Sequence, residues 1–370
     1  MDLVCFATKG AGSNEEDRIQ TLLSPLRPRL FQFDRARKRV SFVRLLDELR
    51  TTRPDIVVME GTGTAGGVAL LIAHGLWATP FVVSSGDAVA PFIAATRPAL
   101  RPIAKIYEWL LYRWSSGFIG WTPYLVGRAL TLGAPRAMTA AGWAPYPART
   151  ELRDETRREL GIPSSAVVFG LVGALEWNRR VGYCYGYELL QAIRRVTRDD
   201  VYVLVAGDGT GTPHLKNAAG PLLGGRVLLP GAIPQTDVPA YLSAIDVVSL
   251  PQSVDAVGSF RYTTKVSEYL SARRPVVTGQ IPLAYDFGDD WLWRLPGEAP
   301  WDERYIAALA GLMTSVTPAQ ISERSAAIPD AVAAFDRDSQ QRQVVSFIED
   351  VVARNGEMLQ RGNGRHVRGG

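Results

Sequence analysis

The residues best placed to do chemistry stand in one short helical stretch of the second half of the chain. Lys265 and Glu268 are three positions apart, so on a helix their side chains lie on one face. Both come near the start of that helix, where its dipole is positive and favours anions. A cation and a carboxylate so placed could hold a phosphate and a sugar hydroxyl together. The same spacing is also common in solvated surface pairs, and spacing alone leaves both interpretations open.

The sequence around this pair predicts the elements that position it. Val266, Tyr269 and Leu270 recur at nearly helical spacing, and Pro275 ends the helix before a β-branched strand at 276–278. Elsewhere in the chain, predicted strands and helices alternate, with glycine-containing loops between them. This alternation is typical of doubly wound α/β sheets.

The chain of 370 residues is long enough for two domains, because single cores stop growing at roughly 250 to 300 residues. A stretch rich in proline and charge around 142–160 marks a boundary. We therefore expect a first domain at 1–150 and a second at 151–337. A final helix at 338–358 and a disordered tail at 359–370 complete the prediction.

Composition excludes several classes of protein. The apolar region 68–83 is interrupted by glycine and proline and is shorter than the ~20 residues that span a bilayer. The chain begins directly with a predicted strand and without a basic leader, so we expect a cytoplasmic protein. Its two cysteines and three histidines are scattered, which predicts no metal site.

Positive charge is concentrated in the first half. Residues 1–150 hold 18 Lys and Arg against 11 Asp and Glu, whereas the whole chain has a net charge of +4. No nucleic-acid motif accompanies these cations, so nucleic acid is not an expected partner. A basic face could instead meet an anionic membrane surface or a phosphorylated lipid, which would make the protein peripheral at the inner face of the membrane. A plain solvated basic surface is the alternative.

The basic and aromatic helix expected after Pro102 leaves a similar choice open. It could lie in a membrane interface, or it could pack on the sheet with its Arg and Lys side chains reaching solvent.

Loops that follow predicted strands of the first half are further candidates, because ligands of doubly wound sheets bind at the carboxyl ends of strands. Gly10 and Gly12 follow the first strand, and Asp87 closes the strand that begins at Pro80. His74 stands alone on an apolar helix, and we expect it in the core.

The segment from Thr263 to Val277 resembles the nucleotide-sugar site of GT-B glycosyltransferases, above all the retaining glycosyltransferase family 4. That family carries Lys-x-x-Glu-Tyr-Leu-Ala-x-Gly-x-Pro-Val-Val, of which this chain has the Lys, Glu, Tyr, Leu, Pro and both Val. The resemblance implies a GT-B fold, with two Rossmann-like doubly wound domains facing each other across a cleft and a last helix that crosses back to the first domain. It also implies that Lys265 meets the donor diphosphate and that Glu268 meets the donor ribose.

Two other loops of the second half carry over by the same resemblance. The loop that begins at Gly173 has the family's Gly-x-Leu form, followed by a basic residue and a glycine. The resemblance places Arg179 or Arg180 on the donor phosphates, where the fixed fork of a guanidinium suits a diphosphate. It places the segment from Gly231 to Ile233 against the nucleobase.

The chain departs from the family at two positions. Phe260 stands where many members carry the first of two glutamates, although Gly258 and Ser259 could still present backbone N–H groups to a phosphate. Gly86 stands where a histidine often precedes the aspartate, so the resemblance leaves only Asp87 to face the donor sugar and the acceptor.

We therefore predict a glycosyltransferase of the hexosyltransferase type that moves a sugar from a UDP- or GDP-sugar to a glycan, lipid-linked or small-molecule acceptor. The resemblance implies retention, with no metal or other cofactor. Arg179, Arg180 and Lys265 would stabilise the leaving diphosphate, and Gly10 and Gly12 would lie on the acceptor side. The alternatives are a GT-B-like nucleotide-sugar epimerase and a non-catalytic subunit that binds a partner enzyme.

Overall fold

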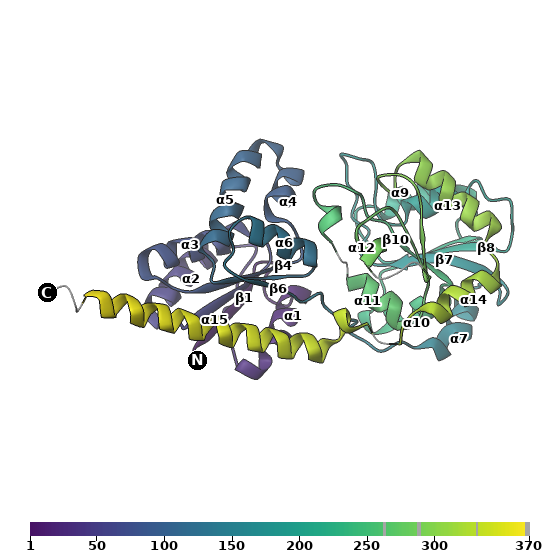
Figure 1. Ribbon diagram of the computed structural model, residues 1–370. Coiled ribbons are helices and arrows are strands. Elements are labelled where there is room, and N and C mark those ends of the chain that lie inside the picture. Colours follow the sequence, from purple (N-terminus) through teal and green to yellow (C-terminus); the bar gives the residue numbers. More distant parts are fainter. Residues whose placement is uncertain (262–263, 287–289, 331, 367–370) are drawn as a thin grey trace. The chain divides into compact units, whose positions relative to one another are not determined.

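The computed structural model of the chain forms two compact units (Figure 1). It describes residues 1–261, 264–286, 290–330 and 332–366. Unit 1 comprises Met1–Gly142, Phe260–Tyr262 and Ala333–Gly370. Unit 2 comprises Trp143–Ser259 and Thr263–Val332.

Unit 1 is built on a six-stranded sheet in the order β2-β1-β3-β4-β5-β6, in which neighbouring strands are parallel. Its central strands are short apolar runs buried along their whole length, as expected where helices cover both faces of a parallel sheet. The strands are Leu3–Ala7 (β1), Arg29–Leu30 (β2), Ile56–Glu60 (β3), Phe81–Ser85 (β4), Gly117–Gly120 (β5) and Ala137–Thr139 (β6).

The helices of unit 1 begin where the sequence supplies caps. The Ser13 hydroxyl accepts the N–H of Glu16 at the start of α1, and Thr122 caps α6 directly before Pro123. The helices are Asn14–Leu23 (α1), Lys38–Thr52 (α2), Thr64–Trp77 (α3), Val89–Thr96 (α4), Arg101–Trp114 (α5), Pro123–Thr131 (α6) and Arg337–His366 (α15).

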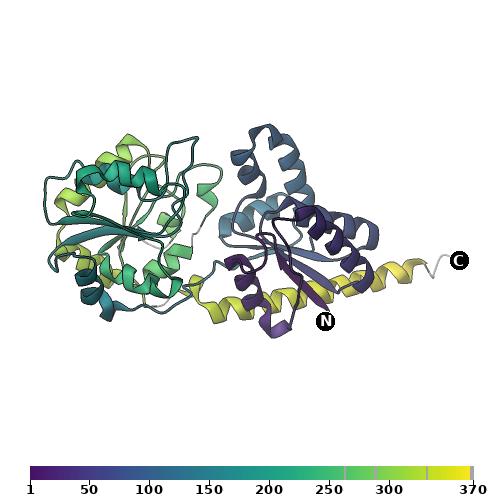
Figure 2. The same ribbon diagram turned by 180° about the vertical axis from the view of Figure 1, so that it is seen from behind.

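The last helix, α15, packs on unit 1. Figures 1 and 2 show it in yellow, running along α1. Val344 and Ile348 are fully buried, and the side chain of Gln341 donates a hydrogen bond of 2.6 Å to the carbonyl of Thr21. Helix α15 therefore buries an apolar face as part of unit 1.

Unit 2 has a second six-stranded parallel sheet, in the order β12-β11-β10-β7-β8-β9. The strands are Val167–Val172 (β7), Val201–Ala206 (β8), Val227–Gly231 (β9), Val247–Leu250 (β10), Val276–Thr278 (β11) and Leu292–Arg294 (β12). The helices are Arg153–Glu159 (α7), Tyr187–Ile193 (α8), Thr212–Ala219 (α9), Val238–Ala244 (α10), Thr264–Ser271 (α11), Leu283–Asp286 (α12), Glu303–Ser315 (α13) and Pro318–Ala327 (α14).

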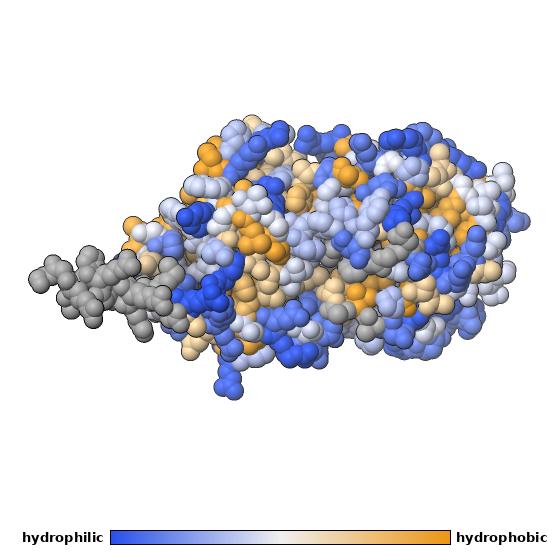
Figure 3. Space-filling model, in the orientation of Figure 1, coloured by the Kyte–Doolittle hydropathy of each residue, from blue (hydrophilic) through white to orange (hydrophobic). Residues whose placement is uncertain are grey.

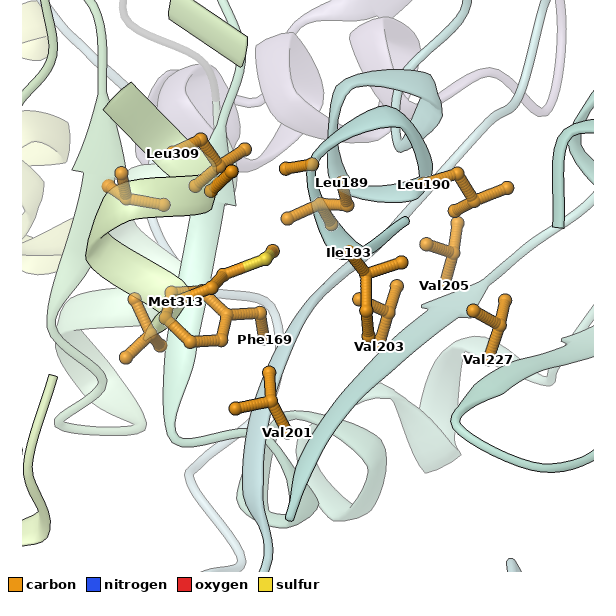
Figure 4. Packing of buried hydrophobic residues seen from close by; sticks show 14 of the residues in the cluster. Phe169, Leu189, Leu190, Ile193, Val201, Val203, Val205, Val227, Leu309 and Met313 are labelled. Atoms are coloured by element: carbon orange, nitrogen blue, oxygen red, sulfur yellow. The ribbon is translucent and has the colours of Figure 1, made fainter. Parts of the chain in front are cut away.

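The core of unit 2 lies between its sheet and the helices α8 and α13. Figure 4 shows Phe169 and Val203 of the sheet facing Ile193, Leu309 and Met313 of these helices. All five side chains are fully buried. In unit 2, apolar strands therefore pack against helices, as the sequence predicted.

The predicted class, α/β with two doubly wound sheets, is confirmed. In each sheet the strand order reverses once, between β1 and β3 in unit 1 and between β7 and β10 in unit 2. Ligands of such sheets bind at the carboxyl ends of the strands beside the reversal. Within the described ranges, no helix is long and apolar enough to cross a membrane.

After β2, Phe31 and Phe33 pack on the ring of Phe6. Two boundaries differ from the sequence prediction. Helix α15 continues to His366, through most of the expected tail, and residues 367–370 lie outside the described part of the chain.

The segment Phe260–Tyr262, expected within the second domain, is grouped with unit 1. The hydroxyl of Thr122 donates a hydrogen bond of 2.8 Å to the carbonyl of Phe260, and the guanidinium of Arg128 lies 5.5 Å from the Phe260 ring.

Candidate functional site

Lys265 lies at the point where the strand order of the second sheet reverses. Its Nζ donates a hydrogen bond of 2.5 Å to the carbonyl of Val172, the last residue of β7. Burial lowers the pKa of Lys265, and the negative charge of Glu268 acts against that shift. Helix α11 thus brings an ammonium group to the carboxyl end of the sheet, where a ligand of a doubly wound fold is expected.

The close approach of Lys265 depends on two glycines. A Cβ atom on Gly173 would lie 1.9 Å from the Nζ of Lys265. A Cβ atom on Gly207, at the end of β8, would lie 1.9 Å from the carbonyl oxygen of Gly173. A side chain at Gly207 would meet backbone, and one at Gly173 would displace the lysine. The two glycines therefore let the loops after β7 and β8 close on each other and on the lysine. Gly173 was a predicted site residue, and in the structure it lies directly beside Lys265.

Glu268 is half-buried on the same helix, so this pair is not the fully solvated pair that the spacing alone allowed. Burial raises the pKa of Glu268, and the positive charge of Lys265 acts against that shift. Its side chain lines a small, mainly apolar pocket of unit 2. The other lining residues are Pro145, Tyr146, Ala148, Val238, Pro239, Leu242, Ser271 and Ala272.

Arg179 and Arg180 are exposed at the tip of a tight loop after β7. The backbones of Asn178 and Tyr183 pair across the base of this loop, with an N···O distance of 2.8 Å from Asn178 to Tyr183. The amide of Arg180 donates a hydrogen bond of 3.0 Å to the side chain of Asn178. The structure therefore fixes the backbone beneath both guanidinium groups.

The expected nucleobase segment begins at Gly231, the last residue of β9. Gly231 has a φ of +87°, a conformation that favours glycine, and its carbonyl accepts the amide of Gly207 at 2.8 Å. Ile233 is half-buried two residues later. The segment is thus tied to the same glycine loop that contacts the loop of Gly173.

Gly258 and Ser259 donate their amides within their own loop. The carboxylate of Asp255 accepts the amide of Gly258 at 2.8 Å, and the carbonyl of Asp255 accepts the amide of Ser259 at 3.1 Å. A Cβ on Gly258 would lie 2.1 Å from the carbonyl oxygen of Ser253, so the turn requires glycine. The two amides predicted to meet a phosphate are engaged with Asp255 in this structure.

In unit 1, the predicted glycine loop lies after β1. Gly10 and Gly12 have φ values of +99° and +72°. The amide of Gly10 donates to the carbonyl of Ala7, and the amide of Gly12 donates to the buried carboxylate of Glu16 at 2.7 Å. Glycine is needed here for the left-handed backbone of a tight turn.

Asp87 follows β4 and forms an ion pair of 2.5 Å with Arg261, which also belongs to unit 1. Gly86, at the position of the family's histidine, lies under the indole of Trp121. A Cβ there would be 2.8 Å from that ring. At this departure from the family pattern, the ring of Trp121 therefore occupies the space next to Gly86.

A buried ion pair of unit 1, between Arg18 and Glu60, was not singled out from the sequence. Arg18 of α1 donates a 2.6 Å hydrogen bond to the carboxylate of Glu60, which ends β3, and Trp121 donates a 3.1 Å bond to the same carboxylate. The guanidinium also lies 4.5 Å from the indole centroid. A glutamate that ends an apolar strand was the available signal for Glu60. Nothing in the spacing pointed to Arg18.

A second buried network in unit 2 was also missed. Glu188 of α8 is fully buried and accepts hydrogen bonds from Tyr183 at 2.8 Å and from Ser249 of β10 at 2.9 Å. Burial raises the pKa of Glu188 to about 7, although both hydrogen bonds act to lower it. The hydroxyl of Tyr269, on the helix of Lys265, donates to the carbonyl of Ser249 at 3.1 Å. The network links the arginine loop, β10 and α11.

Among the residues that the structure describes, no group of three His, Cys, Asp or Glu side chains is placed to hold a metal ion. The charged groups gathered at the reversal point of the second sheet are a cation and a carboxylate, which suit an anionic, hydroxyl-bearing ligand.

Comparison with known proteins shows what the chain is similar to. Residues 166–293, about a third of the chain, match the sequence profile of glycosyl transferases group 1. These residues include β7, the arginine loop and the whole of α11. No curated protein matches the chain by sequence.

Several solved structures have the same fold. Anabaena HepE in complex with UDP-glucose is 16% identical, with a TM-score of 0.70 over 95% of this chain and 100% of that chain. WaaG, a glycosyltransferase involved in lipopolysaccharide biosynthesis, is 13% identical, with a TM-score of 0.67 over 94% and 99% of the two chains. Sucrose-phosphate synthase from Thermosynechococcus elongatus is 11% identical, with a TM-score of 0.64 over 99% and 100%.

The chain therefore has the GT-B fold, and both the expected fold and the expected resemblance to group 1 glycosyltransferases are confirmed. The resemblance in sequence is confirmed for 166–293, the part of the chain that carries Lys265 and Glu268.

Proposed function

We propose that this protein is a glycosyltransferase that moves a sugar from a nucleoside diphosphate sugar to an acceptor. The observation that carries the proposal is the position of Lys265, held by α11 against the carboxyl end of β7 with Gly173 directly beside its Nζ. The match of residues 166–293 to group 1 glycosyltransferases supports it. UDP is the first nucleotide to test, since the similar HepE structure contains UDP-glucose.

In this proposal, Lys265 binds the diphosphate and offsets the negative charge that develops on it as the glycosidic bond breaks. Such a preorganised charge in a partly buried site typically contributes a hundredfold or more to the rate. Arg179 and Arg180 project from a loop of fixed backbone on the same unit and supply further positive charge. Glu268 accepts a hydrogen bond from a ribose hydroxyl. The acceptor hydroxyl transfers its proton to the leaving phosphate, and the sugar keeps its anomeric configuration.

The binding test is calorimetric titration of the protein with UDP, GDP, ADP and TDP. We expect binding of one nucleotide at micromolar concentration, and we expect Lys265→Ala to weaken it at least tenfold. Lys216→Ala is the matched control, because Lys216 is an exposed lysine of the same unit on α9. Equal affinity in the Lys265→Ala and Lys216→Ala proteins would refute the diphosphate role.

The role of Glu268 can be tested separately by changing the ligand. Glu268→Ala should weaken UDP binding but should have little further effect on the binding of UDP analogues that lack the ribose hydroxyl it contacts. Titrations with 2′-deoxy- and 3′-deoxy-UDP identify that hydroxyl. If Glu268→Ala weakens UDP and both deoxy analogues by the same factor, the carboxylate does not bind the ribose.

Turnover distinguishes the transferase from the alternatives. Release of the nucleoside diphosphate only in the presence of an acceptor, with the product anomer read by proton NMR, would support transfer with retention. Interconversion of the nucleotide sugar without an acceptor would indicate an epimerase. Nucleotide binding with no turnover would favour a non-catalytic subunit, an interpretation that Phe260 and Gly86 favour because they replace two residues common in the family.

A further inference from the structure

Helix α5 of unit 1 is apolar on two opposite faces, and only one of them is used for packing. On the inner face, Leu111 and Tyr112 are fully buried in the core of unit 1, and Tyr112 stacks edge-on against Phe118 at 4.9 Å. On the outer face, Ile103 and Ile106 are 65% and 59% exposed. A helix at the surface of a globular protein normally carries polar residues there.

The exposed apolar surface extends beyond these two isoleucines. Trp109, on the same helix, is 48% exposed, and Trp114 at its end is 41% exposed. The ring of Trp114 lies 5.9 Å from His74, so this end of α5 lies against α3, where Leu76 is 68% exposed. Figure 3 shows orange residues at the surface among blue ones over the part of unit 1 that contains α4 and α5. Several large apolar side chains exposed along one helix in this way indicate an interaction site.

The charged side chains exposed around this surface are all positive. Arg97, Arg101, Lys105 and Arg113 are exposed, and none of them forms an ion pair with a described residue. Between residues 88 and 136, all of which the structure describes, Glu108 is the only carboxylate. Glu108 is 1% exposed and is neutralised by Arg128 at 2.5 Å. The outward surface of this region therefore combines apolar and cationic groups without an exposed carboxylate.

We infer that the outer face of α5 is a docking surface for a membrane that contains anionic lipid. Isoleucine side chains enter the boundary between headgroups and acyl chains, tryptophan rings lie at the same depth, and the flanking cations meet the lipid phosphates. The positive charge without exposed carboxylates selects this occupant over a protein partner, whose surface would carry charges of both signs. The inference does not depend on the proposed sugar transfer.

The primary test is co-sedimentation of the whole protein with vesicles of phosphatidylcholine alone and of phosphatidylcholine with phosphatidylglycerol at 3:1. We expect binding to the anionic vesicles, weaker binding to the neutral ones, and loss of binding as salt is raised. No binding to anionic vesicles, or equal binding to both compositions, would overturn the inference. Binding of a protein from solution that competes with the vesicles for this face would also overturn it.

The helix face is tested by the double variant Ile103→Gln with Ile106→Gln. We expect its partition onto anionic vesicles to fall by about tenfold or more, since two inserted apolar groups are lost. Val40→Gln with Val43→Gln is the matched control, because these exposed valines have the same spacing on α2 of the same unit. Equal binding by the two double variants would overturn the assignment to α5.

Two readouts separate this inference from a folding defect and from the proposed function. Far-ultraviolet circular dichroism and nucleotide titration should be unchanged in the isoleucine variant. Quenching of tryptophan fluorescence by brominated lipids should fall in Trp109→Phe, and undiminished quenching would show that Trp109 does not enter the bilayer. Loss of nucleotide binding with intact vesicle binding would refute the proposed function alone.

Discussion

Replacing Glu188 by glutamine should change how the stability of the protein depends on pH. The carboxyl group is fully buried among Tyr183 and Ser249, and its pKa rises from 4.5 to about 7, mainly because burial disfavours its charge. Below pH 4.5 it is protonated in both the folded and the unfolded chain. Between pH 4.5 and 7 the folded protein keeps the proton that the unfolded chain releases, so the free energy of unfolding falls as the pH rises.

The size of this effect follows from the pKa. At 1.36 kcal/mol for each pKa unit, the rise from 4.5 to about 7 corresponds to about 3 kcal/mol. This is a large part of the 5–15 kcal/mol that typically stabilises a folded protein. Above pH 7 the folded protein has also released the proton. The free energy of unfolding then no longer changes with pH through Glu188. Glutamine has a similar shape and carries no charge, so it removes the dependence.

The assay is unfolding in urea at pH 5, 6, 7 and 8, followed by tryptophan fluorescence and circular dichroism, for the natural protein and for Glu188→Gln. We expect the difference in unfolding free energy between the two to move by about 2.5 kcal/mol in favour of the variant from pH 5 to pH 8, because part of the loss is already present at pH 5. Glu155→Gln, at an exposed glutamate of α7, should leave the pH profile unchanged. Parallel profiles for the natural protein and Glu188→Gln would refute the reasoning.

Three other substitutions give direct tests of the packing. Gly173→Ala places a methyl group 1.9 Å from the Nζ of Lys265, so it should displace the lysine and weaken nucleotide binding at least tenfold by calorimetry, whereas unchanged binding would remove the lysine from the site. Arg157→Met should lower the unfolding free energy in urea by about 1–3 kcal/mol, because Asp246 loses its buried partner at 2.7 Å but keeps Arg153 at 2.6 Å, and an unchanged free energy would contradict this. Gly258→Ala meets a carbonyl oxygen at 2.1 Å and should lower the melting temperature by several degrees, and an unchanged melting temperature would show that the turn adapts.

The fold could be predicted from the sequence because its signals are local. The buried strand β7 is a continuous apolar run, and α11 has an apolar stripe that ends before Pro275. Lys265 and Glu268 could be found because their neighbours in sequence match a known pattern. For α5, the sequence predicted only an aromatic and basic helix. It does not say which of the two apolar faces of this helix the core covers.

The rest of the site depends on contacts between distant parts of the chain, which leave no periodic signal. Arg18 and Glu60 meet because β3 lies beside β1 and α1 follows β1, an arrangement that only the folded sheet defines. Glu188 reaches Ser249 across 61 positions of sequence. Gly86 could be read as a missing histidine, but the ring of Trp121 above it could not be foreseen.

The division of unit 1 into separate segments has a consequence for how the protein is made. During synthesis from the N-terminus, the first 142 residues leave the ribosome long before α15, because all of unit 2 is translated in between. The surface of α1 that contacts α15 stays uncovered throughout that interval. We expect ribosome-bound chains that stop before residue 333 to hold a protease-sensitive first unit, so the synthesis of α15, and not the completion of 1–142, sets when that unit becomes stable.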